Sequence, residues 1–401
     1  MAFRHFRESA LIFTFLKAIL EERSYLMELA ANNRTWAEIN LSALKHNLDL
    51  ARATGKKVMC VIKANAYGHG AVECGRFLEK NGADAFAVAS LSEAIELRNA
   101  EIRLPILILG YTPPEYTELL LQYDVMQTAV DEEHAQALSD AAQALGAKLK
   151  IHIKLDTGMS RLGLFAQGTE TAKEAAQSIL RISSMQGLYV EGMFTHFAIA
   201  DEERGNEYSA WQLQNYLTVL NILERNGARP PVCHASNSAC ILYHPEAKFD
   251  MVREGIMLYG LYPSSVPQQG PLKPVMALKS HVVQLKEFPA GTTISYGRTY
   301  EADKPITCAV ICAGYADGLP RRLSSRFEMN INGRFYKQIG RVCMDMCMAD
   351  VTGSDVKRGD EVTLFGHPGI SIEHAAKEVG TINYELTCVV TPRVRRVYIN
   401  D

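Results

Sequence analysis

The amino-acid sequence predicts an α/β protein in which a (β/α)₈ barrel is followed by a smaller domain made of β-strands. Three observations support this prediction. Short apolar runs recur after residue 57, segments with helical spacing separate most of them, and near Pro271 the pattern changes to short alternating strands with glycine turns. We therefore predict a helical extension over residues 1–34, a barrel over 35–270 and a β domain over 271–401.

The composition is that of a soluble globular protein with room for two domains. The 401 residues are 47% hydrophobic and 22% charged, and the formal net charge is −3. This near-neutral charge gives no reason to expect nucleic acid or an anionic membrane as a partner. Nine cysteines without disulfide-scaffold or zinc-site spacing predict free thiols in a reducing compartment, the cytoplasm, and no metal site.

The first 34 residues differ from the rest of the chain. The apolar stretch LIFTFLKAIL (11–20) is interrupted by Lys17 and is too short to cross a bilayer of about 30 Å. We interpret the segment as an amphipathic helix that packs on the body or on a partner chain. A signal peptide and the remnant of a membrane-anchored parent protein are the alternatives. Residues 35–41 then read as a strand.

Eight apolar runs form the predicted barrel strands, with helical segments such as 131–145, 168–180 and 208–225 between them. Eight strands that alternate with helices over about 200 residues match the length and order of a (β/α)₈ barrel. A doubly wound sheet would need fewer strands and a reversal of strand order, which we do not find. The runs are KVMCVIK (57–63), AFAVAS (85–90), PILILG (105–110), VMQTAV (125–130), KLKIHIKLD (148–156), LYVEGMFTH (188–196), PVCHAS (231–236) and FDMVREG (249–255).

The predicted β domain begins near Pro271. Its strand-like segments include VMALKSHVVQL, TTISYGRTY, TCAVICAGYADG and DEVTLFG. The segment MNINGRFYKQIG predicts a hairpin with Asn332 and Gly333 in a type I′ turn, because both central positions of that turn need positive φ.

Polar side chains gather at the predicted carboxyl ends of the barrel strands, where barrel enzymes build their active sites. Each of these residues alone has an ordinary structural explanation, but so many on one rim predict a site. The loops ASNSAC and REGIM, after the last two strands, add the hydroxyl and backbone N–H groups that hold a phosphate. The rim residues are Lys63, Lys154, Asp156, His196, Ser236, Asn237 and Arg253.

A phosphate site that faces a strand-end lysine suggests a phosphorylated aldehyde bound as a Schiff base, which is pyridoxal 5′-phosphate. A sugar-phosphate aldolase with a Schiff-base lysine is the alternative. The additional β domain favours the pyridoxal phosphate enzyme, because an aldolase does not need it.

From Thr35 to the C-terminus, the chain closely resembles the alanine racemases, which are barrel-type pyridoxal phosphate enzymes with a C-terminal β domain. The resemblance covers about nine-tenths of the sequence, and ten motifs occur in the family's order. They are TWAEINL, VIKANAYGHG, KLDTGMSRLG, FTHFAIAD, HASNSA, VREGIMLYGLYP, TISYGRTY, GYADGLPR, GRVCMDM and TINYEL.

The resemblance implies how the cofactor is held. Lys63 would bind the cofactor aldehyde, and Arg253 would face the pyridine nitrogen and keep it unprotonated. Arg161 would lie near the phenolic oxygen and the substrate carboxylate, with Lys154, a position often carbamylated in the family, orienting it. The phosphate ligands would be Tyr67, Ser238, Gly255, Ile256 and Tyr384.

The resemblance also implies a second base and a second subunit. Racemisation needs one group on each face of Cα; Lys63 would serve one face and Tyr296, from a partner subunit, the other. His196 and Arg253 would ease the ionisation of Tyr296 through hydrogen bonds. We therefore expect a homodimer whose active sites are completed in trans. The access channel would be lined by Tyr315, Met344 and Asp345, with the Met344 N–H near the substrate carboxylate.

The predicted function is the interconversion of L- and D-alanine for peptidoglycan. The extension keeps open the catalytic domain of a membrane-bound serine/alanine racemase of vancomycin resistance, although Tyr384 favours alanine. A cofactor-handling barrel without turnover and a decarboxylase are further alternatives, and Tyr296 argues against both. The chain departs from the family pattern at Ser160, Leu319 and Arg395, none of which belongs to the proton-transfer pair.

Overall fold

The computed structural model describes residues 34–202, 205–263, 270–366 and 368–400. The chain divides into two compact units. The barrel unit runs from Asn40 to Val275, and the β unit combines the segment ending at Ile39 with Met276–Tyr398. The predicted helix over residues 1–34 lies outside the described residues, apart from Arg34. None of the described helices is long and apolar enough to span a bilayer.

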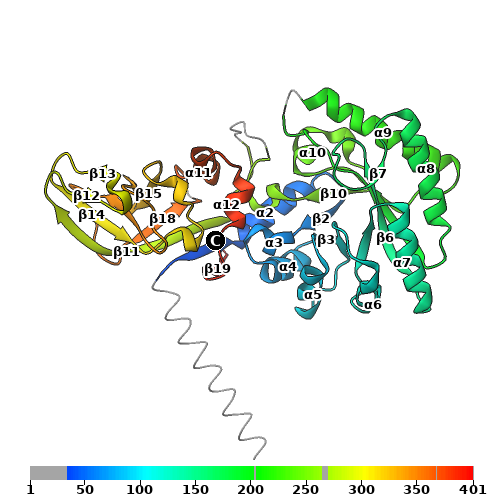
Figure 1. The fold of residues 1–401 in the computed structure, drawn as a ribbon, viewed down its shortest axis with the longest axis horizontal. Coiled ribbons are helices and arrows are strands. Elements are labelled where there is room, and N and C mark those ends of the chain that lie inside the picture. Colours follow the sequence, from blue (N-terminus) through cyan, green and yellow to red (C-terminus); the bar gives the residue numbers. More distant parts are fainter. Residues whose placement is uncertain (1–33, 203–204, 264–269, 367, 401) are drawn as a thin grey trace, which may run out of the picture. The chain divides into compact units, whose positions relative to one another are not determined.

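The described residues of the barrel unit contain the eight parallel strands that the sequence predicts (Figure 1). They follow the order β10-β2-β3-β4-β5-β6-β8-β9. Hydrogen bonds from Asp250 N to Cys233 O (3.0 Å) and from Arg253 N to Ser236 O (3.2 Å) bring β10 beside β9 and nearly close the ring. The strands are β2 (Lys57–Val61), β3 (Ala85–Val88), β4 (Ile106–Ile108), β5 (Met126–Ala129), β6 (Leu149–Asp156), β8 (Leu188–Phe194), β9 (Val232–His234) and β10 (Met251–Glu254), with the short β7 (Leu164–Phe165) beside β6.

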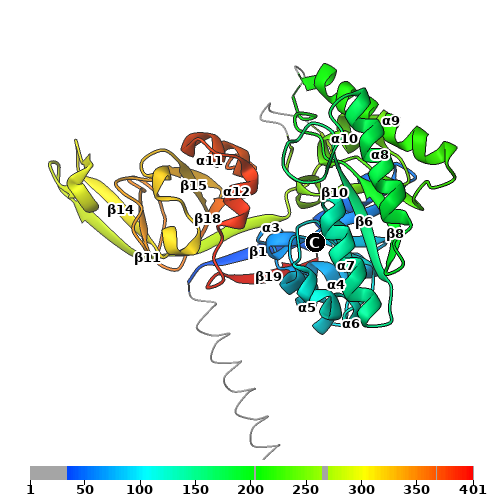
Figure 2. The same ribbon diagram turned by 45° about the vertical axis from the view of Figure 1, so that its right-hand side comes forward.

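Helices surround these strands (Figure 2). Because the strands are covered on both faces, β3 (AFAV) and β4 (ILI) are continuous apolar runs. Strand β6 (LKIHIKLD) instead alternates apolar with polar residues. Side-chain caps start several helices: Ser90 Oγ accepts a hydrogen bond from Glu93 N, and Asp131 Oδ1 accepts one from His134 N. The helices are α2 (Leu41–Arg52), α3 (Lys63–Tyr67), α4 (Ala71–Lys80), α5 (Leu91–Asn99), α6 (Thr117–Gln122), α7 (Glu132–Ala144), α8 (Thr169–Ser183), α9 (Asn206–Arg225) and α10 (Ser238–Tyr243), with 3₁₀ turn η4 (Ile256–Tyr259) after β10.

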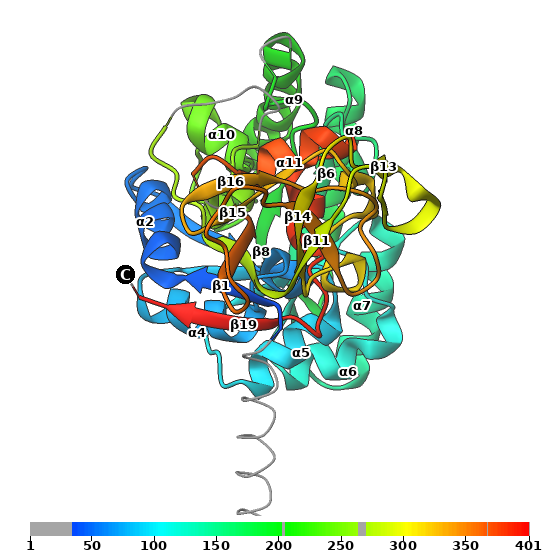
Figure 3. The same cartoon turned by 90° about the vertical axis from the view of Figure 1, so that its left-hand side faces the viewer.

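The β unit is organised around its longest strand, β11 (Met276–Phe288), which pairs antiparallel with β1 (Trp36–Asn40), β14 and β18. Strands β1 and β19, from opposite ends of the sequence, lie side by side (Figure 3). The other elements are β12 (Thr293–Ile294), η5 (Tyr296–Arg298), β13 (Tyr300–Glu301), β14 (Ile306–Ile311), η6 (Tyr315–Asp317), β15 (Glu328–Ile331), β16 (Arg334–Lys337), β17 (Cys347–Asp350), β18 (Glu361–Phe365), α11 (Ile372–Val379), α12 (Asn383–Cys388) and β19 (Arg395–Ile399).

The first strand belongs to a different unit from the one that its place in the sequence suggests. The sequence-based boundary puts residues 35–39 in the barrel, but Trp36 pairs with Lys279 and Ile39 with Met276 in the β unit. Strand pairing depends on a partner that is remote in sequence, which a local pattern does not reveal. The type I′ hairpin is present between β15 and β16, with φ of 51° at Asn332 and 80° at Gly333. None of the nine cysteines, all of which lie among the described residues, forms a disulfide.

Candidate active site

Lys63 stands where strand β2 ends and an unusual turn begins. The four residues after it, Ala64 to Tyr67, have φ between 51° and 55°. This left-handed conformation places Cβ too close to the next carbonyl oxygen and costs roughly 1–2 kcal/mol per residue. A strained backbone of this kind persists only where the surrounding structure holds it, and such strain is concentrated at functional sites.

Two side chains hold the strained turn. Glu93 on α5 accepts hydrogen bonds from Ala64 N at Oε1 and from Ala89 N at Oε2, each at 2.7 Å. Asn65 Oδ1 accepts one from Ala71 N at 2.8 Å, at the start of α4. The turn after Lys63 is therefore tied to the ends of two neighbouring elements.

The end of this turn forms one side of an anion cradle. The Tyr67 ring packs on Tyr259, with centroids 5.0 Å apart. Ser238 Oγ, at the start of α10, accepts hydrogen bonds from Gly255 N (3.0 Å) and Met257 N (3.3 Å). A Cβ at Gly255 would lie 3.2 Å from Tyr67 Oη and 3.5 Å from Ser238 Oγ. Two hydroxyls and backbone N–H groups thus converge at a position where a Cβ would be tightly packed against Tyr67 Oη, and this donor set suits a phosphate.

Arg253 is buried in the barrel and is held by neutral acceptors. One guanidinium nitrogen donates to Thr195 O (2.7 Å) and Ala235 O (3.0 Å), and the other to His234 Nδ1 (2.9 Å) and His234 O (3.2 Å). Burial lowers the pKa of Arg253 to about 10, so the group stays a cation at neutral pH. No carboxylate pairs with it within the described part of the chain.

His196 follows β8 and faces several cations. Its Nδ1 lies 3.5 Å from an Arg253 nitrogen. Burial first, and then the charges of Arg253, Lys154, Arg161 and Lys63, lower its pKa well below the ordinary value. His196 is therefore neutral at neutral pH. Because arginine only donates, Nδ1 of His196 is the acceptor and Nε2 carries the proton.

Lys154 is buried on β6, two residues before Asp156. Its ammonium donates to Leu155 O at 2.7 Å and lies 5.3 Å from the centre of the Phe194 ring. Burial and the nearby cations Arg253 and Arg161 lower its pKa to about 7, although Asp156 acts in the opposite direction. About half of a lysine with this pKa is a neutral amine at pH 7, and the neutral amine is the reactive form.

The loop after β6 brings Arg161 to the same rim. Asp156 Oδ1 shapes this loop by accepting hydrogen bonds from Gly158 N (3.1 Å) and Ser160 N (2.9 Å). Ser160 has φ of 54°, a conformation that favours glycine and explains why a serine stands out there. At Gly163, with φ of 118°, a Cβ would lie 2.8 Å from Lys154 Cγ, so a glycine is needed for the loop to close over Lys154.

Tyr296 lies in the β unit on a second strained loop. Its neighbours Ser295, Gly297 and Arg298 have φ of 68°, 71° and 52°, and Ser295 Oγ donates to Arg341 O at 2.7 Å. The Tyr296 side chain is 69% exposed. It borders a cavity of about 400 Å³ whose other lining residues include Ile294, Val310, Cys343 and Met348.

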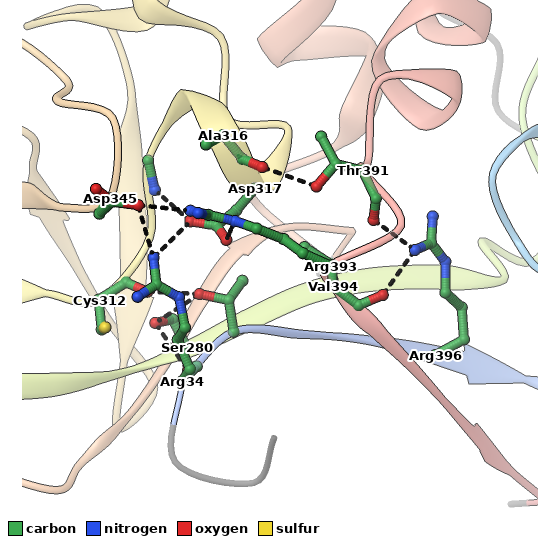
Figure 4. Close-up of polar contacts among 12 residues, drawn as sticks. Arg34, Ser280, Cys312, Ala316, Asp317, Asp345, Thr391, Arg393, Val394 and Arg396 are labelled. Carbon is green, nitrogen blue, oxygen red and sulfur yellow. Dashed lines mark hydrogen bonds and ion pairs between the residues drawn. The ribbon is translucent and has the colours of Figure 1, made fainter. Parts of the chain in front are cut away.

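A network of two arginines and two aspartates holds the predicted channel residues of the β unit (Figure 4). Asp317, which is 1% exposed, pairs with Arg393 at 2.7 Å and with Arg34 at 3.6 Å. Asp345 pairs with Arg34 at 3.2 Å and with Arg393 at 2.9 Å. The network therefore ties Asp345, and with it the adjacent exposed Met344, to the chain ends of the β unit.

The backbone near Tyr315 completes this arrangement. Tyr315 N donates to Cys343 O and Ala316 N to Met344 O, both at 3.0 Å. A Cβ at Gly314 would lie 2.3 Å from Met344 O, so glycine is required for the two loops to touch. Tyr384 lies on α12 of the same unit and is partly buried. Its predicted role at the phosphate stays a prediction.

Comparison with known proteins agrees with this geometry. The family described as alanine racemase, N-terminal domain matches residues 39–263, and alanine racemase, C-terminal domain matches residues 275–398. An alanine racemase of Methanococcus maripaludis is 45% identical over 91% of this chain and 98% of its own length. One of Desulforamulus reducens is 43% identical, with the same coverage of both chains.

The chain belongs to the alanine racemase family.

Solved structures of the family have the same fold. The alanine racemase of Clostridium difficile 630 superposes with a TM-score of 0.86 at 41% identity, over 92% of this chain and 96% of that one. The alanine racemase from E. faecalis gives a TM-score of 0.84 at 36% identity, over 92% of this chain and 99% of that one. Alanine racemases are isomerases that depend on pyridoxal phosphate, and the expected family and fold are therefore confirmed.

Within each unit, the structure brings most of the predicted site residues together. Lys63, Lys154, Arg161, His196 and Arg253 gather on the barrel rim, as the charges that lower the pKa of His196 indicate. Tyr67, Ser238 and Gly255 meet in the anion cradle, and Ile256 lies between Gly255 and Met257, whose N–H groups donate to Ser238 Oγ. In the β unit, Tyr315, Met344 and Asp345 lie on two touching loops.

Several supporting residues were not predicted from the sequence. Glu93 supports the turn after Lys63, His152 and His234 lie behind Arg253, and Arg34 and Arg393 bind Asp345. Apart from His234, these residues lie outside the ten motifs, and each acts through a partner that is remote in the sequence. His234 is the first residue of the motif HASNSA, so the sequence offered a signal for it, whereas His152 lies two residues before the motif KLDTGMSRLG.

Proposed function

We propose that this protein interconverts L- and D-alanine with bound pyridoxal phosphate and supplies D-alanine for peptidoglycan. The observation that supports the proposal best is the combination, on one barrel rim, of Lys63, an anion cradle and the cation Arg253. A phosphorylated aldehyde fits this set, since the cradle offers hydroxyl and N–H donors and the lysine offers an amine. Bound there, the cofactor would delocalise the electron pair left when the Cα–H bond breaks.

The residues of this chain would share the remaining tasks. Lys63 would hold the aldehyde and Arg253 would face the ring nitrogen. Arg161 would bind the phenolic oxygen and the substrate carboxylate, and carbamylated Lys154 would orient Arg161. The phosphate would be held by Tyr67, Ser238, Gly255, Ile256 and Tyr384.

Two proton-transfer groups would act on opposite faces of Cα. Lys63 would move a proton on one face and Tyr296 of a second copy on the other, which makes the active unit a homodimer. The exposure of Tyr296 supports this role, because its phenol is accessible to another chain. His196 is neutral and protonated on Nε2, so it can donate a hydrogen bond to the ionised phenol. Met344 N–H would contact the substrate carboxylate, with Tyr315 and Asp345 lining the access channel.

Exchange of the Cα proton in D₂O, followed by NMR with L-alanine and L-serine separately, tests the proposal. With added pyridoxal phosphate, we expect deuterated D-alanine to form fastest. Lys63→Ala should abolish turnover and the absorbance of the bound cofactor. Tyr296→Phe should retain the absorbance and slow exchange from L-alanine, whereas Tyr300→Phe, a control in the neighbouring strand β13, should behave as wild type. Comparable or faster turnover of serine would instead favour a serine/alanine racemase.

A mixing experiment tests the shared site. Neither Lys63→Ala nor Tyr296→Phe homodimers have an intact site, but a mixed dimer has one site with both residues. Reassociation of the two variants should therefore recover about one quarter of the wild-type activity, since half of random dimers are mixed and half of their sites are intact. Mixtures as inactive as the separate variants, with mixed dimers present, would contradict a site completed in trans.

A further inference from the structure

A chain of three polar side chains crosses the interior of the barrel behind the candidate site. His152 on β6 lies with its Nδ1 2.9 Å from Nε2 of His234 on β9. His234 in turn lies with its Nδ1 2.9 Å from an Arg253 nitrogen on β10. All three are buried, with exposures of 1%, 0% and 3%. The function proposed above assigns a role to Arg253 but none to the two histidines.

The positions of the protons in this chain follow from Arg253. A guanidinium only donates, so His234 Nδ1 is an acceptor and the His234 proton is on Nε2. That N–H points to His152 Nδ1, which must accept it, and the proton of His152 is then on its own Nε2. Burial, followed by the charge of Arg253, lowers the pKa of His152 to about 3 and that of His234 well below the ordinary value, so both rings are neutral.

The fold makes room for His152 at some expense in stability. Its Nε2 has no hydrogen-bond partner among the described residues, and such a buried N–H costs roughly 1–3 kcal/mol. On the neighbouring strand β8, a Cβ at Gly192 would lie 2.5 Å from the His152 ring. The register between β6 and β8 also shifts between Ile151 and His152. A small apolar side chain would avoid the unpaired N–H and the close contact at Gly192, so His152 calls for a functional explanation.

The explanation lies in how Arg253 is oriented. One of its guanidinium nitrogens is fixed by two main-chain carbonyls, those of Thr195 and Ala235. Among the described residues, only His234 binds the other nitrogen, through Nδ1 and the main-chain oxygen. If the His234 ring rotated, an N–H or C–H group would face the guanidinium in place of the lone pair. His152 prevents that rotation by accepting the His234 Nε2–H.

We propose that His152 is a positioning residue for the racemase reaction: it holds the His234 ring so that His234 fixes the guanidinium of Arg253 on the active-site rim. The proposal rests on the proposed function, because it assumes that the position of Arg253 matters for turnover. The orientation of His234, however, is a property of the protein itself and is measurable without cofactor.

A matched pair of variants separates this role from simple packing. Asparagine at position 152 places an oxygen near the site of Nδ1 and can accept the His234 N–H, whereas leucine has similar bulk and no acceptor. His134→Leu is the control, because it also removes a buried imidazole, one whose Nε2 is 2.9 Å from Thr112 O on the outer side of the barrel.

The first readout is ¹⁵N NMR of histidine side chains in the cofactor-free protein. In wild type, His152→Asn and His134→Leu, we expect His234 to be protonated on Nε2 and unprotonated on Nδ1. In His152→Leu, we expect the ¹⁵N signals of His234 to show a mixture of tautomers. The second readout is steady-state racemisation. We expect kcat to fall roughly 10–100-fold in His152→Leu with little change in KM, by analogy with groups that orient metal ligands, and most of it to return in His152→Asn.

Two results would overturn the proposal: a His152→Leu protein with wild-type kcat and an unchanged His234 signal, or equal losses of kcat in His152→Leu and His152→Asn. A wild-type protein without racemase activity would refute the proposed function instead, while the ¹⁵N signals would still report whether His152 orients His234.

Discussion

Carbon dioxide should convert Lys154 from a buried cation into a carbamate anion. The amine nitrogen would form a bond to the carbon of CO₂ and release a proton, and this requires the neutral amine. With a pKa lowered to about 7, about half of Lys154 is neutral at pH 7, against roughly one in three thousand for a lysine at its ordinary pKa. The product would place a negative charge near Arg161 and Arg253, whose positive charges now disfavour the ammonium.

The same pKa predicts how the unmodified residue affects stability. A fall from 10.5 to about 7 means that protonated Lys154 lowers the free energy of unfolding by up to roughly 5 kcal/mol. Because the unfolded chain binds this proton more tightly, the full loss is present below pH 7, and stability recovers as pH rises from 7 toward 10.5. In CO₂-free buffer, Lys154→Met should be more stable than wild type at pH 6 and should lack most of that pH dependence.

Two assays check this prediction. Equilibration with ¹³C-bicarbonate should give a carbamate carbon signal in wild type that is absent from Lys154→Met, and urea unfolding at pH 6 and pH 9 should give the stability difference. Lys279→Met is the control: although burial acts in the opposite direction, hydrogen bonds from Lys279 to Glu38 and Glu361 raise its pKa, so its removal should lower stability and retain the carbamate signal. Equal wild-type stability at both pH values, or a carbamate signal that persists in Lys154→Met, would refute the reasoning.

Three further predictions follow from named contacts. Asn65→Ala should lower the free energy of unfolding by about 1–2 kcal/mol, because it removes the hydrogen bond to Ala71 N and puts alanine in a left-handed position. Urea unfolding measures this loss, with Asn81→Ala as a control that also removes a side-chain amide. A larger loss of stability in Asn81→Ala than in Asn65→Ala would count against the prediction. Glu254 is buried without a hydrogen-bond partner in the described structure, and burial followed by the charge of Asp49 raises its pKa well above the ordinary value. The contribution of Glu254 to the free energy of unfolding should therefore fall as pH rises from about 4.5 toward that raised pKa. The difference in stability between Glu254→Gln and wild type should shift in favour of the variant over this range in urea unfolding curves; parallel pH profiles of the two proteins would contradict the prediction. Arg393→Met should raise the KM for alanine several-fold with a smaller change in kcat, because the loop of Asp345 and Met344 loses the ion pair with Arg393. Steady-state kinetics with L-alanine and with D-alanine measure the KM. An unchanged KM would mean that this network does not act on the substrate.

The sequence determined the features that local patterns encode. Each barrel strand lies within one of the predicted runs, and burial on both faces makes strands such as β3 and β4 continuously apolar. The Asn332-Gly333 turn has the positive φ values that its two residues favour. The motif order identified the family, and the rim position of Lys63, His196 and Arg253 followed from the rule that barrel sites lie at strand ends.

The tertiary structure decided everything that depends on remote partners. Strand β1 belongs to the β unit because it pairs with β11, and the strained turn after Lys63 persists because Glu93 and Asn65 bind its ends. Likewise, Lys154 has a pKa of about 7 only because the folded barrel buries it beside Arg253. Apolar periodicity is a property of adjacent residues, whereas strand pairing, strain and pKa are set by groups that meet only when the chain folds.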